Sequence, residues 1–287
     1  MSTLVERMNQ DMQLRGLSPR TQRSYTQAIR KLEQHYDKSA ERITQEQIRE
    51  YFLFRKNANQ WSPSTATIAL CAIKFFYENT LKKDLSDVRM IRPKRAKKLP
   101  VVLSTQEVRR ALKCIHLLHH RVCLTTIYSC GLRIKEAVRL KVPNIDSDRM
   151  FLHIHGKGSK DRYVPLPQRT LQLLREHWVT HRNPQWLFPA KTRRGHSQAT
   201  CDTTLSVSTI QRAFKDAIFK GRINKVASVH SLRHSYATHL LEQGVDVRVI
   251  QQFLGHAHCQ TTMIYTKLTE PAIKPAAEII NHLMADL

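Results

Sequence analysis

The stretch VHSLRHSYATHL, residues 229–240, places a histidine and an arginine three residues apart at the beginning of a predicted helix. Residues at this spacing share one helix face, so His230 and Arg233 are expected to point the same way. An adjoining apolar stripe, which predicts burial of the helix, is formed by Leu232, Tyr236 and Leu240. A His-x-x-Arg pair is common by chance, so its meaning depends on the rest of the chain.

Length and charge narrow the class of protein. The chain has 287 residues, enough for two domains, and its 41% hydrophobic and 24% charged residues are typical of a folded globular protein. Lys and Arg number 47 against 23 Asp and Glu, which gives a formal net charge of +24. This excess favours a polyanionic partner, because each phosphate that is neutralised releases counterions. Nucleic acid is the leading candidate.

The sequence gives less support to a membrane protein, a disulfide-rich protein or a metal-binding protein. We find no apolar run of about 18 residues and no signal-peptide pattern, so we expect no membrane association and a cytoplasmic location. The 6 cysteines form no C-x-x-C pair. His256, His258 and Cys259 lie close together, but no matching second ligand pair accompanies them. We therefore predict neither a metal site nor a cofactor.

The first 91 residues are predicted to form a small helical domain. Ser18 is a predicted N-cap followed by Pro19 at the first helical position, and Thr44 with Gln47 forms a predicted capping box. A strongly apolar helix follows Pro63.

A basic linker is predicted over residues 92–103. Pro93 and Pro100 disfavour helix. The basic residues of the linker are Arg92, Lys94, Arg95, Lys97 and Lys98. They can be ordinary solvated charges, but the overall charge favours an interpretation in which they lie along phosphates.

Residues 104–287 are predicted to form a second domain that mixes helices with a small antiparallel sheet. Ser104 and Glu107 form another predicted capping box. Two short strand-like runs, 150–155 and 162–167, flank a glycine-containing turn and predict a hairpin. The helices expected after it span residues 168–181, 208–220, 230–243 and 246–254.

Four stretches of this domain together resemble the tyrosine recombinases, or phage-type integrases. They are CGLRIKEAVRL (130–140), HGKGSKDR (155–162), VHSLRHSY (229–236) and LGHAHCQTTMIYTKL (254–268). The order of an arginine box, a lysine hairpin, a His-x-x-Arg box, a Leu-Gly-His box and a terminal tyrosine is specific, although each box alone is weak. The resemblance covers nearly the whole chain and is strongest to the Xer and integron-integrase branch. It implies a helical SAM-like core-binding domain followed by a mixed α+β catalytic domain.

The chemistry of this family explains the residue types. Attack on a phosphodiester builds negative charge on nonbridging oxygens, and Arg133 and Arg233 can meet that charge with forked hydrogen bonds. The resemblance implies that Tyr265 forms a 3′-phosphotyrosine link and that His230 assists removal of its proton. It further implies that Lys157 protonates the departing 5′ oxygen and that His256 donates to a nonbridging oxygen.

Several neighbouring residues are assigned supporting roles. Glu136, one helical turn from Arg133, either orients that guanidinium or forms an exposed ion pair with Lys135 or Arg139. Lys160 and Arg162 are predicted to contact DNA. Lys160 also competes with Lys157 for the acid role.

The function expected from the resemblance is site-specific recombination or integration of double-stranded DNA, as in mobile elements and transposition. A homotetramer is expected on paired sites, with a monomer or dimer when free, and the C-terminal helix could pack in cis or on a neighbouring subunit. Two alternatives remain open: a catalytically silent DNA-binding protein of the same fold, and a type IB topoisomerase-like relaxing enzyme.

Overall fold

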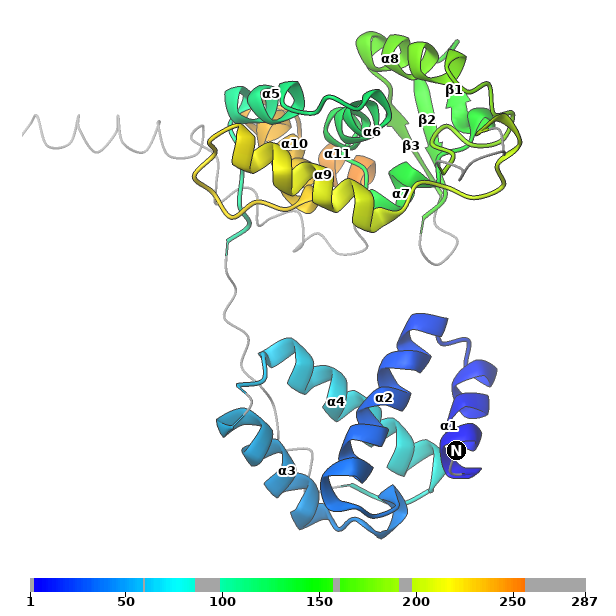
Figure 1. Ribbon diagram of the computed structural model, residues 1–287, viewed down its shortest axis with the longest axis vertical. Helices are drawn as coiled ribbons and strands as arrows, with labels where there is room; N and C mark the ends of the chain where they lie inside the picture. Colours follow the sequence, from blue (N-terminus) through cyan, green and yellow to red (C-terminus); the bar gives the residue numbers. More distant parts are fainter. Residues whose placement is uncertain (1–2, 59, 86–98, 157–160, 191–197, 256–287) are drawn as a thin grey trace, which may run out of the picture. The chain divides into compact units, whose positions relative to one another are not determined.

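The computed structural model describes residues 3–58, 60–85, 99–156, 161–190 and 198–255. The chain forms two compact units, residues 1–98 and residues 99–287, each of which is described by itself (Figure 1). Linker residues 92–98 lie outside the described residues. The predicted domain boundaries at residues 91 and 104 therefore stay a prediction.

The first unit is entirely helical in its described part. Its elements are α1 (Thr3–Leu14), α2 (Pro19–Tyr36), the short 3₁₀ helix η1 (Ala40–Arg42), α3 (Gln45–Asn57), α4 (Pro63–Phe75) and the π-helical turn η2 (Phe76–Thr80). Helix α2 packs against α4 and α1 (Figure 1). The fully buried side chains at its centre include Met8, Ile29, Leu32, Ile48 and Phe76.

The predicted caps of this unit are confirmed. The hydroxyl of Ser18 accepts a hydrogen bond from the backbone N–H of Thr21, and Pro19 opens α2. Thr44 and Gln47 cap each other at the beginning of α3, with distances of 3.2 and 3.0 Å. Each cap satisfies backbone donors that the first turn of a helix leaves without partners.

The second unit surrounds a larger core with helices. Its elements are α5 (Thr105–Lys113), α6 (Leu118–Ser129), α7 (Ile134–Val138), η4 (Val142–Asn144), β1 (Ile145–Asp146), β2 (Phe151–Ile154), β3 (Arg162–Pro165), α8 (Gln168–Val179), η5 (Gln198–Thr200), α9 (Val207–Lys220), α10 (Val229–Glu242) and α11 (Val247–Leu254). Helix α10 packs on α6, α9 and α11. In the described part of the chain, no helix has both the length and the apolar character needed to cross a membrane.

The sheet is antiparallel, in the order β1-β2-β3. Ile154 pairs with Arg162, and Leu152 pairs with Val164. Because side chains alternate between the two faces of a strand, these four residues share the buried face. The intervening residues His153 and Tyr163 lie on the outer face.

The predicted fold class is confirmed: the protein is mostly helical with a small antiparallel sheet. The hairpin and the four helices expected after it all form, with ends that differ by only a few residues. The two-residue strand β1 was not predicted, because a segment so short carries no periodicity.

The glycine before the first arginine box lets two helices approach closely. Gly131 follows α6 with φ +60°, in the left-handed region. A Cβ at this position would lie 2.5 Å from ring atoms of Tyr236 in α10. No other residue type fits both the backbone conformation and this contact.

We therefore expect Gly131→Ala to destabilise the second unit by about 2–4 kcal/mol, the sum of left-handed strain and overpacking. Gly244→Ala is the matched control, because Gly244 has φ +83° but a Cβ added there would meet no atom within 4 Å. It should cost only about 1 kcal/mol from strain alone. Urea unfolding of both variants measures the difference, and equal losses would show that the approach of Tyr236 does not constrain residue 131.

Candidate active site

Glu136 organises the first arginine box. Its carboxylate is 10% exposed in the first turn of α7, where one oxygen accepts the backbone N–H of Arg133 at 2.8 Å. The other oxygen accepts Nη1 of the same arginine, also at 2.8 Å. The alternative partners Lys135 and Arg139 are exposed and form no ion pair with Glu136 in the structure. Of the two interpretations left open by the sequence, the geometry favours the orienting role.

Arg162 of β3 joins this cluster, which differs from the DNA contact predicted for it. Its Nη1 and Nη2 donate to the two oxygens of Glu136 at 3.1 and 2.8 Å, and its side chain is only 6% exposed. The reason is strand alternation: Arg162 lies on the same buried face as Val164. Its guanidinium is occupied inside the protein, so the structure favours a positioning role over contact with DNA.

Arg233 of α10 is the third guanidinium near the same carboxylate. Its side chain is 1% exposed, and Nη1 lies 3.8 Å from Glu136 Oε2. Nη1 also donates to the carbonyl of Gly131 at 2.7 Å. The side chain of Arg133, by contrast, is 40% exposed.

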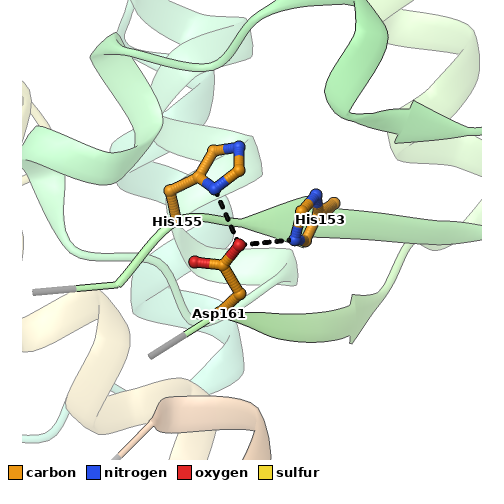
Figure 2. Close-up of side chains that lie close together, drawn as sticks. All are labelled: His153, His155 and Asp161. Atoms are coloured by element: carbon orange, nitrogen blue, oxygen red, sulfur yellow. Dashed lines mark hydrogen bonds and ion pairs between the residues drawn. The ribbon is translucent and has the colours of Figure 1, made fainter. Parts of the chain in front are cut away.

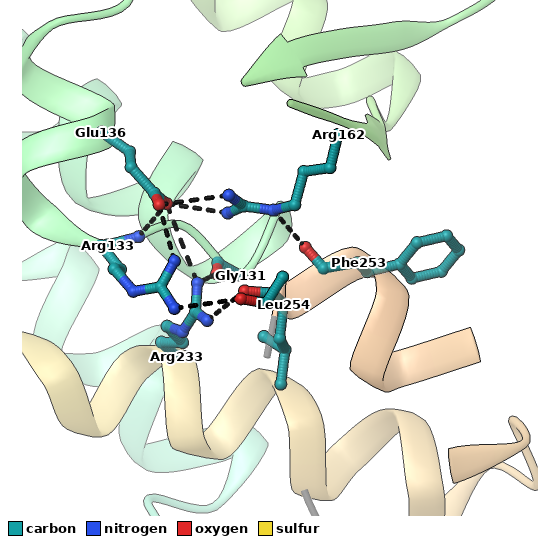
Figure 3. Close-up of polar contacts among 8 residues, drawn as sticks. Gly131, Arg133, Glu136, Arg162, Arg233, Phe253 and Leu254 are labelled. Atoms are coloured by element: carbon teal, nitrogen blue, oxygen red, sulfur yellow. Dashed lines mark hydrogen bonds and ion pairs between the residues drawn. The ribbon is translucent and has the colours of Figure 1, made fainter. Parts of the chain in front are cut away.

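The same three arginines also hold the end of α11 (Figure 3). Arg162 Nε donates to the carbonyl of Phe253 at 2.7 Å, Arg233 Nη2 donates to that of Leu254, and Arg133 Nη2 makes a longer contact of 3.4 Å with that of Gly255. The last carbonyls of a helix lack partners within the helix and carry partial negative charge, so cations stabilise them. The chain is thus fixed up to the residue before His256.

The charges in this cluster do not balance. Burial alone would raise the pKa of Glu136, but the hydrogen bonds and charge of Arg162, together with the hydrogen bonds of Arg133, lower it to about 2. One carboxylate therefore faces three guanidiniums, which leaves two net positive charges. Arg133 is the exposed member, and its Nε has no hydrogen-bond partner among the described residues. The arrangement can bind an anion at Arg133.

His230 stands at the beginning of α10, one turn before Arg233. Its imidazole is partly exposed, and partial desolvation, followed by the charges of Arg233 and Arg133, lowers its pKa. The ring of His234 lies beside it at 4.5 Å between centroids. The lowered pKa favours the neutral imidazole, the form that accepts a proton.

The structure brings together only part of the predicted site. Arg133, Glu136, His230 and Arg233 lie around one cluster, to which Arg162 is added. The other predicted site residues lie outside the described residues: Lys157, Lys160, His256 and Tyr265 of the second unit, and Arg92, Lys94, Arg95, Lys97 and Lys98 of the linker.

Comparison with known families finds two matches that together span most of the chain. The phage integrase family matches residues 101–271, and the N-terminal SAM-like domain of phage integrases matches residues 4–87.

Individual relatives agree with these matches. A putative integrase/recombinase of Sinorhizobium fredii, y4qK, is 40% identical over 93% of this chain and 85% of its own length. The tyrosine recombinase XerA of Pyrococcus furiosus is 32% identical over 98% of this chain and 95% of its own. Among solved structures, a dimer of lambda integrase residues 75–356 bound to a COC′ core site shares the fold with a TM-score of 0.73 at 16% identity, over 92% of this chain and 94% of that fragment.

Replacing the carboxylate that the three arginines share should make the second unit less stable. We expect Glu136→Gln to reduce the free energy of unfolding by about 3 kcal/mol, because the guanidiniums of Arg162 and Arg233 lose their counter-charge in a buried setting. Glu176→Gln, at an exposed position of α8, is the control and should change stability by less than about 0.5 kcal/mol. Chemical denaturation measures both, and similar stabilities for the two variants would contradict the structural role of the cluster.

The protonation state of His230 can be read directly. We expect its imidazole to titrate below about 6.5, the ordinary histidine value, because the folded protein disfavours the charged ring. Histidine resonances in NMR spectra, recorded against pH and assigned with His230→Gln, give the midpoint. A peptide of residues 226–234 provides the unfolded reference. A midpoint above that of the peptide would mean that the arginines do not act on His230.

Proposed function

The chain belongs to the phage integrase family, and from this membership we propose that it is a site-specific DNA recombinase that cuts and rejoins strands through a 3′-phosphotyrosine intermediate. The observation that carries the proposal is the arginine cluster, in which a partly exposed Arg133 is oriented by Glu136 beside a neutral His230. The net charge of +24 supports DNA as the substrate.

The proposed reaction conserves the phosphodiester bond energy. The hydroxyl oxygen of Tyr265 attacks the scissile phosphorus, a new phosphorus–oxygen bond forms, and the bond to the 5′ oxygen breaks. The phenol, with an ordinary pKa near 10, needs help to lose its proton, and His230 receives it. Lys157 gives a proton to the departing 5′ oxygen. Rejoining reverses these steps, so no ATP is consumed.

The arginines have unequal parts in this proposal. Arg133 can reach a nonbridging oxygen directly through its exposed edge, where the charge that develops in the transition state is stabilised. Arg233, enclosed at 1% exposure, completes the positive field and fixes the end of α11, after which His256 follows. Arg162 acts as a positioning residue, because it touches Glu136 and Phe253 rather than the solvent-exposed edge.

Further contacts with DNA are proposed for basic residues outside the arginine cluster. The basic linker residues Arg92, Lys94, Arg95, Lys97 and Lys98, together with Lys160, are proposed to lie along DNA phosphates. The assembly proposed for strand exchange is a homotetramer on two paired sites. A solved XerH recombinase bound to its palindromic difH substrate shares the fold, with a TM-score of 0.70 at 22% identity, and supports DNA as the partner.

The nucleophile provides the decisive test. We expect Tyr265→Phe to retain DNA binding and to lose all covalent adduct, because phenylalanine has no hydroxyl to attack phosphorus. Sites recovered by sequencing DNA crosslinked to the protein supply the substrate, which is nicked near the cleavage position to trap the adduct. Denaturing gels then measure the protein–DNA species.

Tyr163→Phe is the matched control, since Tyr163 is a 57% exposed tyrosine of the same unit, and it should form the adduct normally. A persistent adduct in Tyr265→Phe would refute the assignment. Absence of any adduct in the unaltered protein would favour a silent DNA-binding protein. Relaxation of single plasmids without exchange between two sites would favour a topoisomerase-like enzyme.

A further inference from the structure

Three potential metal ligands gather on the outer face of the sheet, away from the arginine cluster. His153 is in β2, His155 directly follows that strand, and Asp161 directly precedes β3. Residues two apart on a strand point to the same side, and the neighbours of the histidines, Leu152 and Ile154, are buried on the opposite side. The two imidazoles therefore face outward together.

Their ligand atoms converge on one point (Figure 2). Asp161 Oδ2 lies 3.0 Å from His153 Nε2 and 2.9 Å from His155 Nδ1. All three ligand atoms lie within 4.8 Å of one another. Among the described residues, this is the one group of at least three His, Cys, Asp or Glu side chains arranged in this way.

We propose that His153, His155 and Asp161 bind a divalent transition-metal ion of the zinc class. Imidazole nitrogens and a carboxylate oxygen are ligands that such ions prefer, and three protein ligands plus water complete a tetrahedral site. Ligand bonds of about 2.0–2.2 Å place two tetrahedral ligand atoms roughly 3.4 Å apart. The separations of 3.0 and 2.9 Å from Asp161 must widen by a few tenths of an ångström, and the two histidine nitrogens, within 4.8 Å of each other, must reach the same spacing.

Surrounding packing holds one of these ligands in orientation. The ring of Tyr163 stacks on that of His153, with centroids 4.9 Å apart and an interplanar angle of 17°. Tyr163 in turn meets Phe151 edge to face at 6.5 Å. Support of this kind reduces the freedom that a ligand loses when it binds an ion.

Coordination also sets the tautomers of the two histidines. The lone pairs of His153 Nε2 and His155 Nδ1 must face the ion, so the neutral rings carry their protons on His153 Nδ1 and His155 Nε2. A cluster held only by hydrogen bonds to Asp161 needs protons on the opposite nitrogens. The metal-bound cluster and the hydrogen-bonded cluster therefore differ in which ring nitrogens carry the protons.

A bound ion would join the end of β2 to the beginning of β3. Between His155 and Asp161 the sequence runs through Gly156 to Lys160 and includes Lys157, the proposed general acid. The ion would thus tie the two ends of that segment together on the outer face, while Arg162 ties β3 to Glu136 on the inner face. This consequence for strand cleavage rests on the proposed function, whereas the binding of the ion does not.

The test uses the untagged full-length protein and cobalt(II) as a spectroscopic substitute for zinc. We expect cobalt to produce visible d–d absorption that zinc abolishes, and to perturb the NMR signals of the Tyr163 and Phe151 rings. His153→Gln, His155→Gln and Asp161→Asn should each weaken binding at this site at least about tenfold, because loss of even an outer partner costs about 10–100-fold. Circular dichroism checks that each variant is folded.

His116→Gln, an exposed histidine of the same unit, is the control and should bind cobalt as the unaltered protein does. Unchanged affinity in all three ligand variants would overturn the proposal, as would loss of binding only after Cys259→Ser. Absence of cobalt perturbation at Tyr163 would overturn it as well. Because none of these measurements involves DNA, their outcome is independent of whether the protein recombines strands.

Discussion

The carboxylate of Glu136 is the contact on which the rest of the candidate site depends. It accepts hydrogen bonds from Arg133 and Arg162, lies close to Arg233, and so connects the beginning of α7, strand β3 and helix α10. Each guanidinium then reaches a carbonyl at the end of α11. A buried charge that loses its partner is costly, so the members of such a cluster stabilise one another. The site is therefore a consequence of packing between segments more than 100 residues apart.

The three arginines of the cluster lie in different environments, although their side chains are chemically identical. Arg133 keeps an exposed edge for a ligand, whereas Arg162 and Arg233 are enclosed and hold the scaffold. In our proposal, the surplus of positive charge is fixed before a phosphate binds, which avoids the cost of reorganisation during the reaction. In our proposal, the same cluster aligns the strand that follows Lys157 and the helix that precedes His256.

Local rules predicted much of the fold. The caps at Ser18, Thr44 and Ser104 form as expected, because a cap depends on residues only three positions apart. A basic residue beside a lysine hairpin suggests contact with DNA, as predicted for Arg162, whereas the two-residue period from Val164 places its side chain on the buried face. The same period places His153 and His155 on one face, but their approach to Asp161 requires the pairing of two strands. The contact between Gly131 and Tyr236 depends on tertiary packing that no local pattern encodes.

Glu136 and Arg162 are expected to act as one coupled unit rather than as two independent contributors to stability. A double-mutant cycle on the free energy of unfolding, with Glu136→Gln, Arg162→Met and the combined variant, measures this coupling directly. Residues within one charged network typically show interaction energies of about 0.5–3 kcal/mol, and we expect a value above about 1 kcal/mol for this pair. Strict additivity of the two single effects would contradict it.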